Sequence, residues 1–375
     1  MTDSLPLRGR LVLDLSQGIA GPACGMAMAE HGARVIKVEP PAGDWIRALG
    51  APADPENPGA TPFSLYYNRG KESLALDLKS EKGRAAALKL AARADLLIES
   101  GRPGVTEAMG LGFDAVRALN PAIVYLTISG FGLEGPRRAD PMVDTYAQAF
   151  TGMMSINRDV TGEPVRFGQP LIDAVTGLYA AQAALSALYP SERPTEGRRL
   201  DISLTQSAAA LMGPKVLEWT VTGGRSENIN PPAGIYRAAD RHLAFTLVRE
   251  VEWAAICRAL GREDWLADPR YGSFALRNVN KDALRAEMDA LFATDTAEAW
   301  SAKLQAQGVM ARPVNDFGAW LAEEQVQAMR AAPATDYDGV TLPTPRTPSR
   351  QPFDAASPRA DAHGARIAAE FGLDL

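Results

Sequence analysis

The sequence predicts an α/β protein with a large, Rossmann-like, doubly wound domain and a smaller α+β domain. In the first third of the chain, short apolar segments typical of buried strands alternate with patterns typical of helices. Strands that alternate with helices form βαβ units, in which the strands run parallel and helices cover the sheet. Five strands are predicted, at residues 11–15, 35–38, 74–78, 96–98 and 123–129.

Two helices between these strands have recognisable ends. Gly21-Pro22 opens the first, with Pro22 at its first position, and Gly32 closes it. An Ala-rich segment at 80–94 predicts the second. Ligands of doubly wound sheets bind beyond the carboxyl ends of the strands. We therefore expect site residues at 16–18, 39–40, 79, 99–101 and 129–132.

The rest of the chain indicates further divisions. The large domain covers residues 1–222, with a helix at about 205–221 near its end. Gly, Asn and Pro at 223–233 indicate a linker into a small α+β domain, residues 223–330. That domain has a strand at 242–247 and helix faces that include Trp253, Leu284 and Trp300. Residues 331–375, rich in proline, predict an extended strap and a final helix.

Composition narrows the class of protein. The 375 residues are 46% hydrophobic and 22% charged, with a net charge of -6 and a pI near 5.3. There is no broad basic field, which disfavours a nucleic-acid partner. Two distant cysteines give no disulfide framework and fit a reducing, cytoplasmic compartment. Residues 1–10 lack the apolar segment of a signal peptide, and no uninterrupted apolar stretch predicts a membrane span.

Asp173 is the best candidate for a reactive group. Three histidines and two cysteines leave little room for a His-based triad, a thiol enzyme or a zinc site. Asp173 lies where Gly168 and Pro170 lead into an Ala- and Leu-rich helix. One interpretation is a helix N-cap, for which aspartate is preferred. The other is a nucleophile, which the helix N-terminus would keep ionised near neutral pH for attack on an acyl carbon.

A series of short motifs along most of the chain resembles the family III CoA-transferases, the CaiB/BaiF family that includes formyl-CoA:oxalate and carnitine CoA-transferases. Each motif is weak alone, and their order and spacing make the set specific. The matching segments are 11–16, 20–22, 32–39, 43–47, 68–71, 76–79, 94–105, 120–121, 129–136 and 144–148.

The resemblance implies a function and a set of site residues. Asp173 occupies the position of the family's nucleophile, which forms an aspartyl anhydride and then an aspartyl-CoA thioester. CoA or acyl-CoA is a substrate, a small carboxylic acid is the acceptor, and no tightly bound cofactor or metal is expected. The family also implies an interlocked homodimer whose large domain uses both chain ends. Contacts with CoA carry over to Gln17, Gly18, Ile19, Ala20, Leu76, Lys79, Ser100, Gly101, Arg102 and Met109.

The phosphates of CoA attract basic groups and helix N-termini. Arg137 and Arg138 join Lys79 and Arg102 as candidates for these contacts. Pro40 and Ala108 stand where some members have an arginine, so those phosphate contacts are either lost or supplied by neighbouring residues. Tetrahedral oxyanions need donors, which backbone N–H groups after Ser129 or in the Gln17-Gly18 turn could supply.

Transfer of CoA within one dicarboxylic acid stays open, since it needs the same nucleophile, and so do two alternatives to a transferase. The α-methylacyl-CoA racemases of the same family have a histidine before the residue that matches Asp144, where this chain has Val143. A non-catalytic acyl-CoA-binding protein is the other alternative. The acids are not identified: Arg225 or Arg249 could pair with a dicarboxylate, and the lack of a run of glycines disfavours oxalate. His242 and His363 are assigned to structure.

Overall fold

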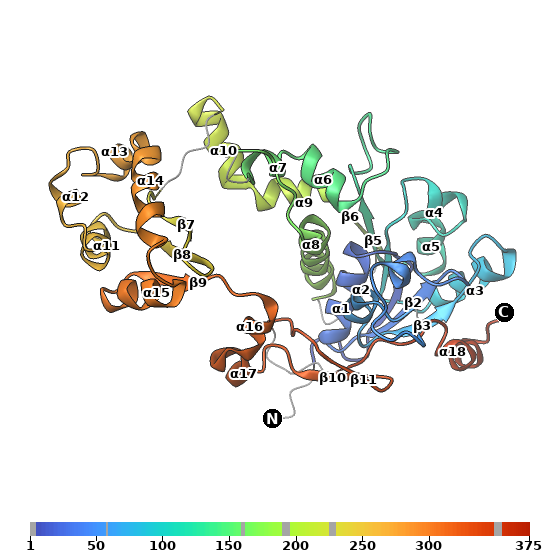
Figure 1. Ribbon diagram of the computed structural model, residues 1–375. Coiled ribbons are helices and arrows are strands. Elements are labelled where there is room, and N and C mark those ends of the chain that lie inside the picture. The colour runs from blue at the N-terminus through green and yellow to red at the C-terminus, as the bar shows by residue number, and fades with distance from the viewer. Residues whose placement is uncertain (1–4, 58, 159–161, 190–195, 225–229, 349–354) are drawn as a thin grey trace. The chain divides into compact units, whose positions relative to one another are not determined.

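The computed structural model describes residues 5–57, 59–158, 162–189, 196–224, 230–348 and 355–375. The chain forms two compact units (Figure 1). The first consists of Met1–Leu217 with Ala332–Leu375, and the second of Glu218–Ala331. The two ends of the chain thus belong to one unit.

A six-stranded sheet forms the centre of the first unit, and all of its strand pairs are parallel. The strand order is β3-β2-β1-β4-β5-β6, which reverses direction between β1 and β4 and confirms the predicted parallel sheet. The strands are β1 (Leu11–Asp14), β2 (Arg34–Glu39), β3 (Glu72–Ala75), β4 (Leu96–Glu99), β5 (Val124–Ser129) and β6 (Arg198–Ser203). β3 ends earlier than predicted, because the chain turns at Asp77 toward the helix cap at Ser80.

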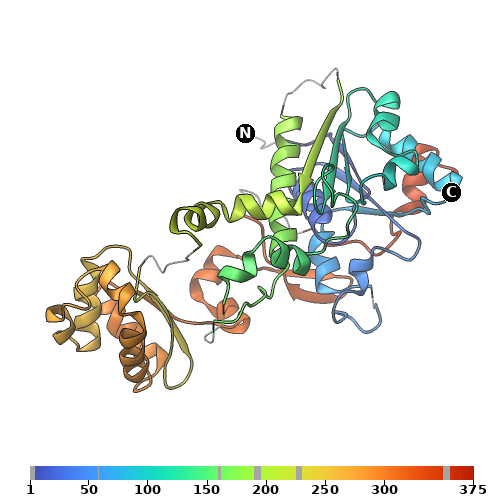
Figure 2. The ribbon, with the colours of Figure 1, turned by 90° about the horizontal axis from the view of Figure 1, so that it is seen from above.

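Apolar cores lie on both faces of this sheet, because successive strand residues point to opposite sides. Val12 belongs to one core and Leu13 to the other. The first core is completed by α1 (Ala20–Glu30), α8 (Leu171–Leu188) and α9 (Leu204–Leu211). The second is completed by α3 (Glu81–Ala91), α5 (Phe113–Leu119) and α18 (Gly364–Phe371), so the sheet is doubly wound (Figures 1 and 2).

Some helices begin or end at residues other than those predicted. Pro22 is the third residue of α1 and not the first, since the helix begins at Ala20. The helix predicted at 205–221 is two helices, because α9 ends at Leu211 and Gly213-Pro214 opens the next one. The remaining helices before residue 223 are η1 (Trp45–Ala48), α2 (Pro62–Tyr67), α4 (Val105–Ala108), α6 (Asp144–Phe150), α7 (Met153–Ile156) and α10 (Gly213–Thr222).

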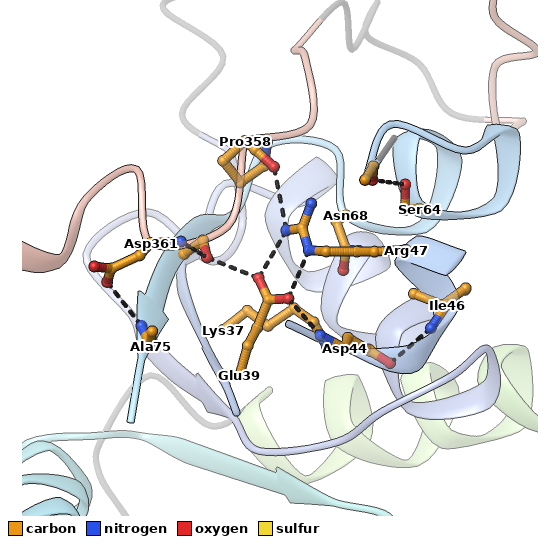
Figure 3. A network of polar contacts seen from close by, with 12 residues as sticks. Lys37, Glu39, Asp44, Ile46, Arg47, Ser64, Asn68, Ala75, Pro358 and Asp361 are labelled. Atoms are coloured by element: carbon orange, nitrogen blue, oxygen red, sulfur yellow. Dashed lines mark hydrogen bonds and ion pairs between the residues drawn. The ribbon is translucent and has the colours of Figure 1, made fainter. Parts of the chain in front are cut away.

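The C-terminal segment docks on β3 and the loop after β2. Ala75 donates a backbone hydrogen bond to Asp361 (2.8 Å), and Arg47 lies between Glu39 (2.7 Å) and the Pro358 carbonyl oxygen (3.2 Å; Figure 3). The Ser73 N–H donates to Nδ1 of His363 (3.1 Å), which gives this histidine a structural role.

The tail is not extended throughout. β10 (Ala334–Tyr337) and β11 (Val340–Pro343) form an antiparallel hairpin that the proline-rich pattern did not predict.

The second unit has a three-stranded antiparallel sheet, in the order β7-β8-β9, covered by helices. The predicted helix faces are buried, with Trp253, Leu284 and Trp300 in its core. Its elements are β7 (Gly234–Arg237), β8 (His242–Thr246), α11 (Glu252–Leu260), α12 (Asp264–Ala267), α13 (Phe274–Val279), α14 (Lys281–Phe292), α15 (Ala297–Ala306), β9 (Met310–Pro313), α16 (Phe317–Ala322) and α17 (Glu324–Met329).

Length and composition alone would let α8 cross a bilayer, and it is the one helix of the described segments for which this holds. The core helix of a soluble protein passes the same test, and 44% of α8 is buried inside the protein. Ile172, Ala180 and Ala184 are fully buried in the first unit. The helix also carries Asp173 in its first turn.

Candidate active site

A cavity of about 710 Å³ lies at the carboxyl ends of β1, β4 and β5. The strand order reverses at this point, which is where doubly wound sheets bind ligands. The sequence placed the site at this edge, and the structure has a cavity there. Its wall consists of Leu15, Gln17, Ile19, Ala20, Trp45, Leu78, Glu99, Ser100, Gly101, Arg102, Pro103, Val105, Thr106, Met109, Ile128, Ser129, Gly130, Arg138, Asp140, Met142, Val143, Asp173 and Leu204.

The cavity brings Asp173 together with most of the residues expected to contact CoA. Those in the wall are Gln17, Ile19, Ala20, Ser100, Gly101, Arg102, Met109 and Arg138. Four others lie outside it. Gly18 is a buried residue of the turn after β1, Leu76 belongs to the apolar core, Lys79 is exposed beyond β3, and Arg137 pairs with Asp140 (3.0 Å).

Asp173 is not the cap of its helix. It is the third residue of α8, whose N-cap position is held by Pro170 without a side-chain hydrogen bond. Asp144, the first residue of α6, takes the capping role instead. Its Oδ1 accepts from the N–H groups of Ile172 (2.7 Å) and Asp173 (3.2 Å). The N-cap interpretation of Asp173 was therefore wrong, and its carboxyl group is free to face the cavity.

The charge state expected for Asp173 also needs correction. Burial, together with the nearby negative charge of Asp144, raises the pKa of Asp173 from 3.8 to about 7. Two N–H groups of the helix start, those of Ile172 and Asp173, donate to Asp144 and so do not offset this effect. Asp173 is thus a basic carboxylate that holds its proton more strongly than an ordinary aspartate.

Gly177 lets α8 approach α1 closely, one turn after Asp173. A Cβ atom at this position would lie 2.6 Å from the Cβ of Ala23 and 2.8 Å from the carbonyl oxygen of Ala20. The close crossing places the start of α8 beside the start of α1. Asp173 therefore faces the same cavity as Ile19 and Ala20.

The turn after β1 is held from behind by two side chains. The Gly18 N–H donates to both carboxylate oxygens of Asp44 (3.1 and 3.2 Å), and the Gln17 N–H donates to Oγ of Ser100 (3.0 Å). These two N–H groups are engaged and do not point to an oxyanion. Of the two loops expected to supply oxyanion donors, only the one after Ser129 keeps that assignment, and it stays a prediction.

Fully buried ion pairs support this turn. Lys71 pairs with Asp14 (2.9 Å) and Lys37 pairs with Asp44 (2.9 Å), and Lys37 also donates to the Ser16 carbonyl oxygen (2.8 Å). Burial alone would raise the pKa of Asp14, but Lys71 and Lys37 hold it below its ordinary value. Buried charges persist only when they are paired and hydrogen-bonded in this way.

Glu99 is a second unusual carboxyl group in the cavity wall. It ends β4, accepts a hydrogen bond from the Gly101 N–H (2.8 Å) and is almost fully buried. Burial raises its pKa to about 7, against the opposing effect of that hydrogen bond. Its place at a strand end was predicted, but its chemistry was not.

Sequence reasoning missed other parts of the wall. Trp45, from the short helix η1, lies against Gly18, whose φ of +79° and close approach leave no room for a side chain. No motif signals this contact. Of the arginines considered for an acid substrate, Arg249 is exposed and paired with Glu252 (2.9 Å), and Arg225 lies outside the described residues. None of the chain's three histidines lines the cavity.

Comparison with known proteins fits this geometry. The model of CoA-transferase family III matches residues 7–363. The succinate–glutarate CoA-transferase of Agrobacterium fabrum is 31% identical over 98% of this chain and 96% of its own length. The acetyl-CoA:oxalate CoA-transferase of Acetobacter aceti is 33% identical, over 83% of this chain and 81% of its own.

A solved structure has the same fold. The CaiB/BaiF family protein of Brucella suis superposes with a TM-score of 0.87 and 29% identity, over 98% of this chain and all of that one. A match over nearly the whole length, in sequence and in fold, leaves one assignment: the chain belongs to the family III CoA-transferases and is an enzyme that transfers CoA between an acyl-CoA and a carboxylate.

Proposed function

We propose that Asp173 is the nucleophile of this transfer. Its carboxylate oxygen attacks the thioester carbon of the acyl-CoA donor, the C–S bond breaks, and CoA leaves as a thiolate. The thiolate sulfur then attacks the Asp173 carbonyl carbon of the resulting anhydride, and the donor acid leaves as a carboxylate. The acceptor carboxylate reverses these two steps on the aspartyl-CoA thioester, so the thioester bond is conserved.

One observation carries this proposal: Asp173 is a basic, partly buried carboxylate in the wall of the cavity at the strand ends. A carboxylate that holds its proton to about pH 7 is more nucleophilic than an exposed aspartate and is still largely ionised at pH 8. The apolar wall beside it, from Ile19, Met142 and Leu204, limits access of water to an anhydride.

We place CoA against the polar part of the same cavity. Arg102 and Arg138 offer positive charge to phosphate groups, and Ser100 and Gln17 offer hydrogen bonds. We assign CoA to this side and the acyl group to the side of Asp173. The acceptor is a small carboxylic acid; acetyl-CoA with oxalate and succinyl-CoA with glutarate, named for the two relatives, are the first pairs to test.

A dimer accounts for apolar side chains that the chain leaves exposed. α10 has no buried residue although it carries Leu217 (69% exposed) and Trp219 (55% exposed). Leu178 on α8 is also exposed. Exposed apolar surface of this kind is typical of interfaces, and we assign the exposed side chains of α8 and α10 to contacts with a second copy of the chain. Light scattering after gel filtration should give twice the chain mass, and a monomer at micromolar concentration would contradict the assignment.

The nucleophile is tested by peptide mapping. The enzyme is incubated with acetyl-CoA or succinyl-CoA, trapped with hydroxylamine and digested. Because Glu99, Asp140 and Asp173 all line the cavity, the map decides between three carboxylates. We expect the hydroxamate on Asp173 alone and no transfer by the Asp173→Asn variant. Asp114→Asn, at an exposed position on α5, is the matched control. Substantial transfer by the Asp173→Asn variant would refute the assignment.

A further inference from the structure

The side chain of Asp144, which belongs to α6, accepts hydrogen bonds from the start of another helix, α8. Asp144 is the first residue of α6, lies 28 residues before Ile172, and is 6% exposed. Its Oδ1 accepts from two backbone N–H groups of α8, and its Oδ2 accepts from Nε2 of Gln148 (2.6 Å). Both carboxylate oxygens are therefore fixed by protein donors.

Gln148 extends this arrangement to the loop that leads into α8. It is fully buried, one turn after Asp144 on α6. Its Oε1 accepts from the Phe167 N–H (2.9 Å), and its Nε2 lies 3.4 Å from the Phe167 carbonyl oxygen and 3.5 Å from that of Gln169. The two side chains thus hold residues 167–169 and the first turn of α8 to α6.

We propose that Asp144, held by Gln148, is a positioning residue for the transfer reaction: it occupies the capping role at the start of α8 and fixes the Asp173 carboxyl, uncapped and beside a second carboxylate, in the cavity. This inference rests on the proposed function, since it assigns Asp173 as the nucleophile. Asp144 itself is not in the cavity wall, so it acts on the substrate only through Asp173.

The charged and titratable groups around Asp173 agree with this role. Asp144 on α6 is the charge that acts on it, and Tyr67 on α2 is a titratable neighbour, with a pKa raised to about 12 by burial and by nearby groups that include Asp173. Arg138 and Asp140 line the same cavity. The wall residues from α9 and from the start of α1 carry no charge. Burial is the larger cause of the raised pKa of Asp173, and among the described residues Asp144 is the one charged group that adds to it, so removal of the Asp144 charge should lower this pKa.

A basic Asp173 has a consequence for the anhydride. Thiolate attack on the Asp173 carbonyl carbon expels the donor carboxylate, whereas attack on the donor carbonyl carbon expels Asp173. The less basic carboxylate leaves more readily, so the anhydride proceeds to the aspartyl-CoA thioester. The equilibrium also favours the aspartyl-CoA thioester, because its formation consumes the more basic carboxylate of Asp173 and releases the less basic carboxylate of the donor acid. Asp144 should therefore increase the fraction of enzyme that carries CoA.

The first test needs no substrate. The pH at which Asp173 titrates is obtained from the difference in Tm between chains with and without Asp173→Asn, measured from pH 4 to 9. We expect this midpoint to be lower by about one pH unit in the Asp144→Asn background, which keeps an acceptor oxygen for the cap but removes the charge. An unchanged midpoint would overturn the proposal, because loss of a purely structural cap lowers Tm without moving the titration of Asp173.

The second test measures CoA on Asp173. With acetyl-CoA or succinyl-CoA and a fixed amount of the donor acid, intact mass after acid quench gives the ratio of CoA-bearing to free enzyme. This ratio should fall by up to about tenfold in Asp144→Asn at pH 8, in proportion to the lost basicity. An equal ratio in both proteins would contradict the positioning role and leave the nucleophile assignment intact. CoA on a residue other than Asp173 would instead refute the proposed function.

A third variant separates position from charge. Asp144→Ala removes both the cap and the charge and should lower kcat by about 100-fold or more, since a displacement of about 1 Å has that effect, while KM changes less. Gln148→Leu, which keeps Asp144, should show a smaller loss of kcat and serves if the first variant does not fold. Full kcat in a folded Asp144→Ala protein would overturn the proposal.

Discussion

Replacement of Asp173 with asparagine is expected to stabilise the folded protein at pH 8 and to have little effect near pH 4. In the folded protein the pKa of Asp173 is raised from 3.8 to about 7. Between these values the folded protein holds a proton that the unfolded chain has released, so stability falls as pH rises through this interval. Above about pH 7 the full penalty is present, and below about pH 4 it is absent.

The size of this penalty follows from the shift. A rise of roughly three pH units at about 1.4 kcal/mol each gives an upper bound of about 4 kcal/mol. The carboxyl group is partly exposed and solvent screens it, so we expect about 1–3 kcal/mol between pH 4 and pH 8. Asparagine cannot ionise, so the variant is not destabilised in this way. Reactive groups in active sites commonly lower the stability of the folded protein.

Thermal unfolding at closely spaced pH values checks this. The Asp173→Asn protein should melt several °C above the parent at pH 8, and the difference should shrink steadily below pH 7. Asp114→Asn is the matched control, because Asp114 is exposed and should show no such trend. A difference in Tm that stays constant from pH 4 to pH 8, or a lower Tm at pH 8, would refute the reasoning about the environment of Asp173.

Three further changes test other parts of the site. Gly177→Ala should lower the free energy of unfolding by about 1–3 kcal/mol, because the new Cβ overlaps Ala23 and the Ala20 carbonyl oxygen. Gly213→Ala is the control in the same thermal melt, because Gly213 has open space around it. Lys71→Met should lower the free energy of unfolding by about 3–5 kcal/mol, because Asp14 is left buried without its partner. As a control measured in the same denaturant titration, loss of the exposed Arg137–Asp140 pair should change this free energy by less than about 1 kcal/mol. Glu99→Gln should tighten CoA binding about two- to tenfold at pH 8 and little at pH 6, because Glu99 titrates at about pH 7 and its charge repels phosphate; equal calorimetric affinities of both proteins at pH 8 would contradict this.

The sheet was predictable because its signal is local. Each central strand is a short apolar segment, and alternation along β1 sends Val12 and Leu13 to opposite cores. Parallel strands with helices between them then bring the strand ends together at one edge. The positions of Gln17 and Ser100 at the cavity follow from this, although 83 residues separate them.

The chemistry of the site was less predictable because it depends on contacts between distant segments. Asp173 has the sequence signature of an N-cap, and nothing near it shows that Asp144 takes that role. The Gln17-Gly18 turn seemed to offer free N–H groups, but Asp44 and Ser100 accept both. In each case a side chain from elsewhere satisfied a backbone donor that the local sequence left open.

Helix capping explains why the proposed nucleophile, Asp173, lies beside a second carboxylate, Asp144. A carboxylate that caps a helix accepts its free N–H groups and gains stability as an anion, which lowers its basicity. Such an aspartate would be well ordered but a weak nucleophile. Asp173 is the third residue of α8 and does not cap the helix, so its carboxylate oxygens face the cavity. Asp144 instead accepts the hydrogen bonds of the N–H groups at the helix start. Asp144 thus stabilises the helix start. Its hydrogen bonds to the N–H groups do not stabilise the Asp173 anion, so they do not lower the basicity of Asp173.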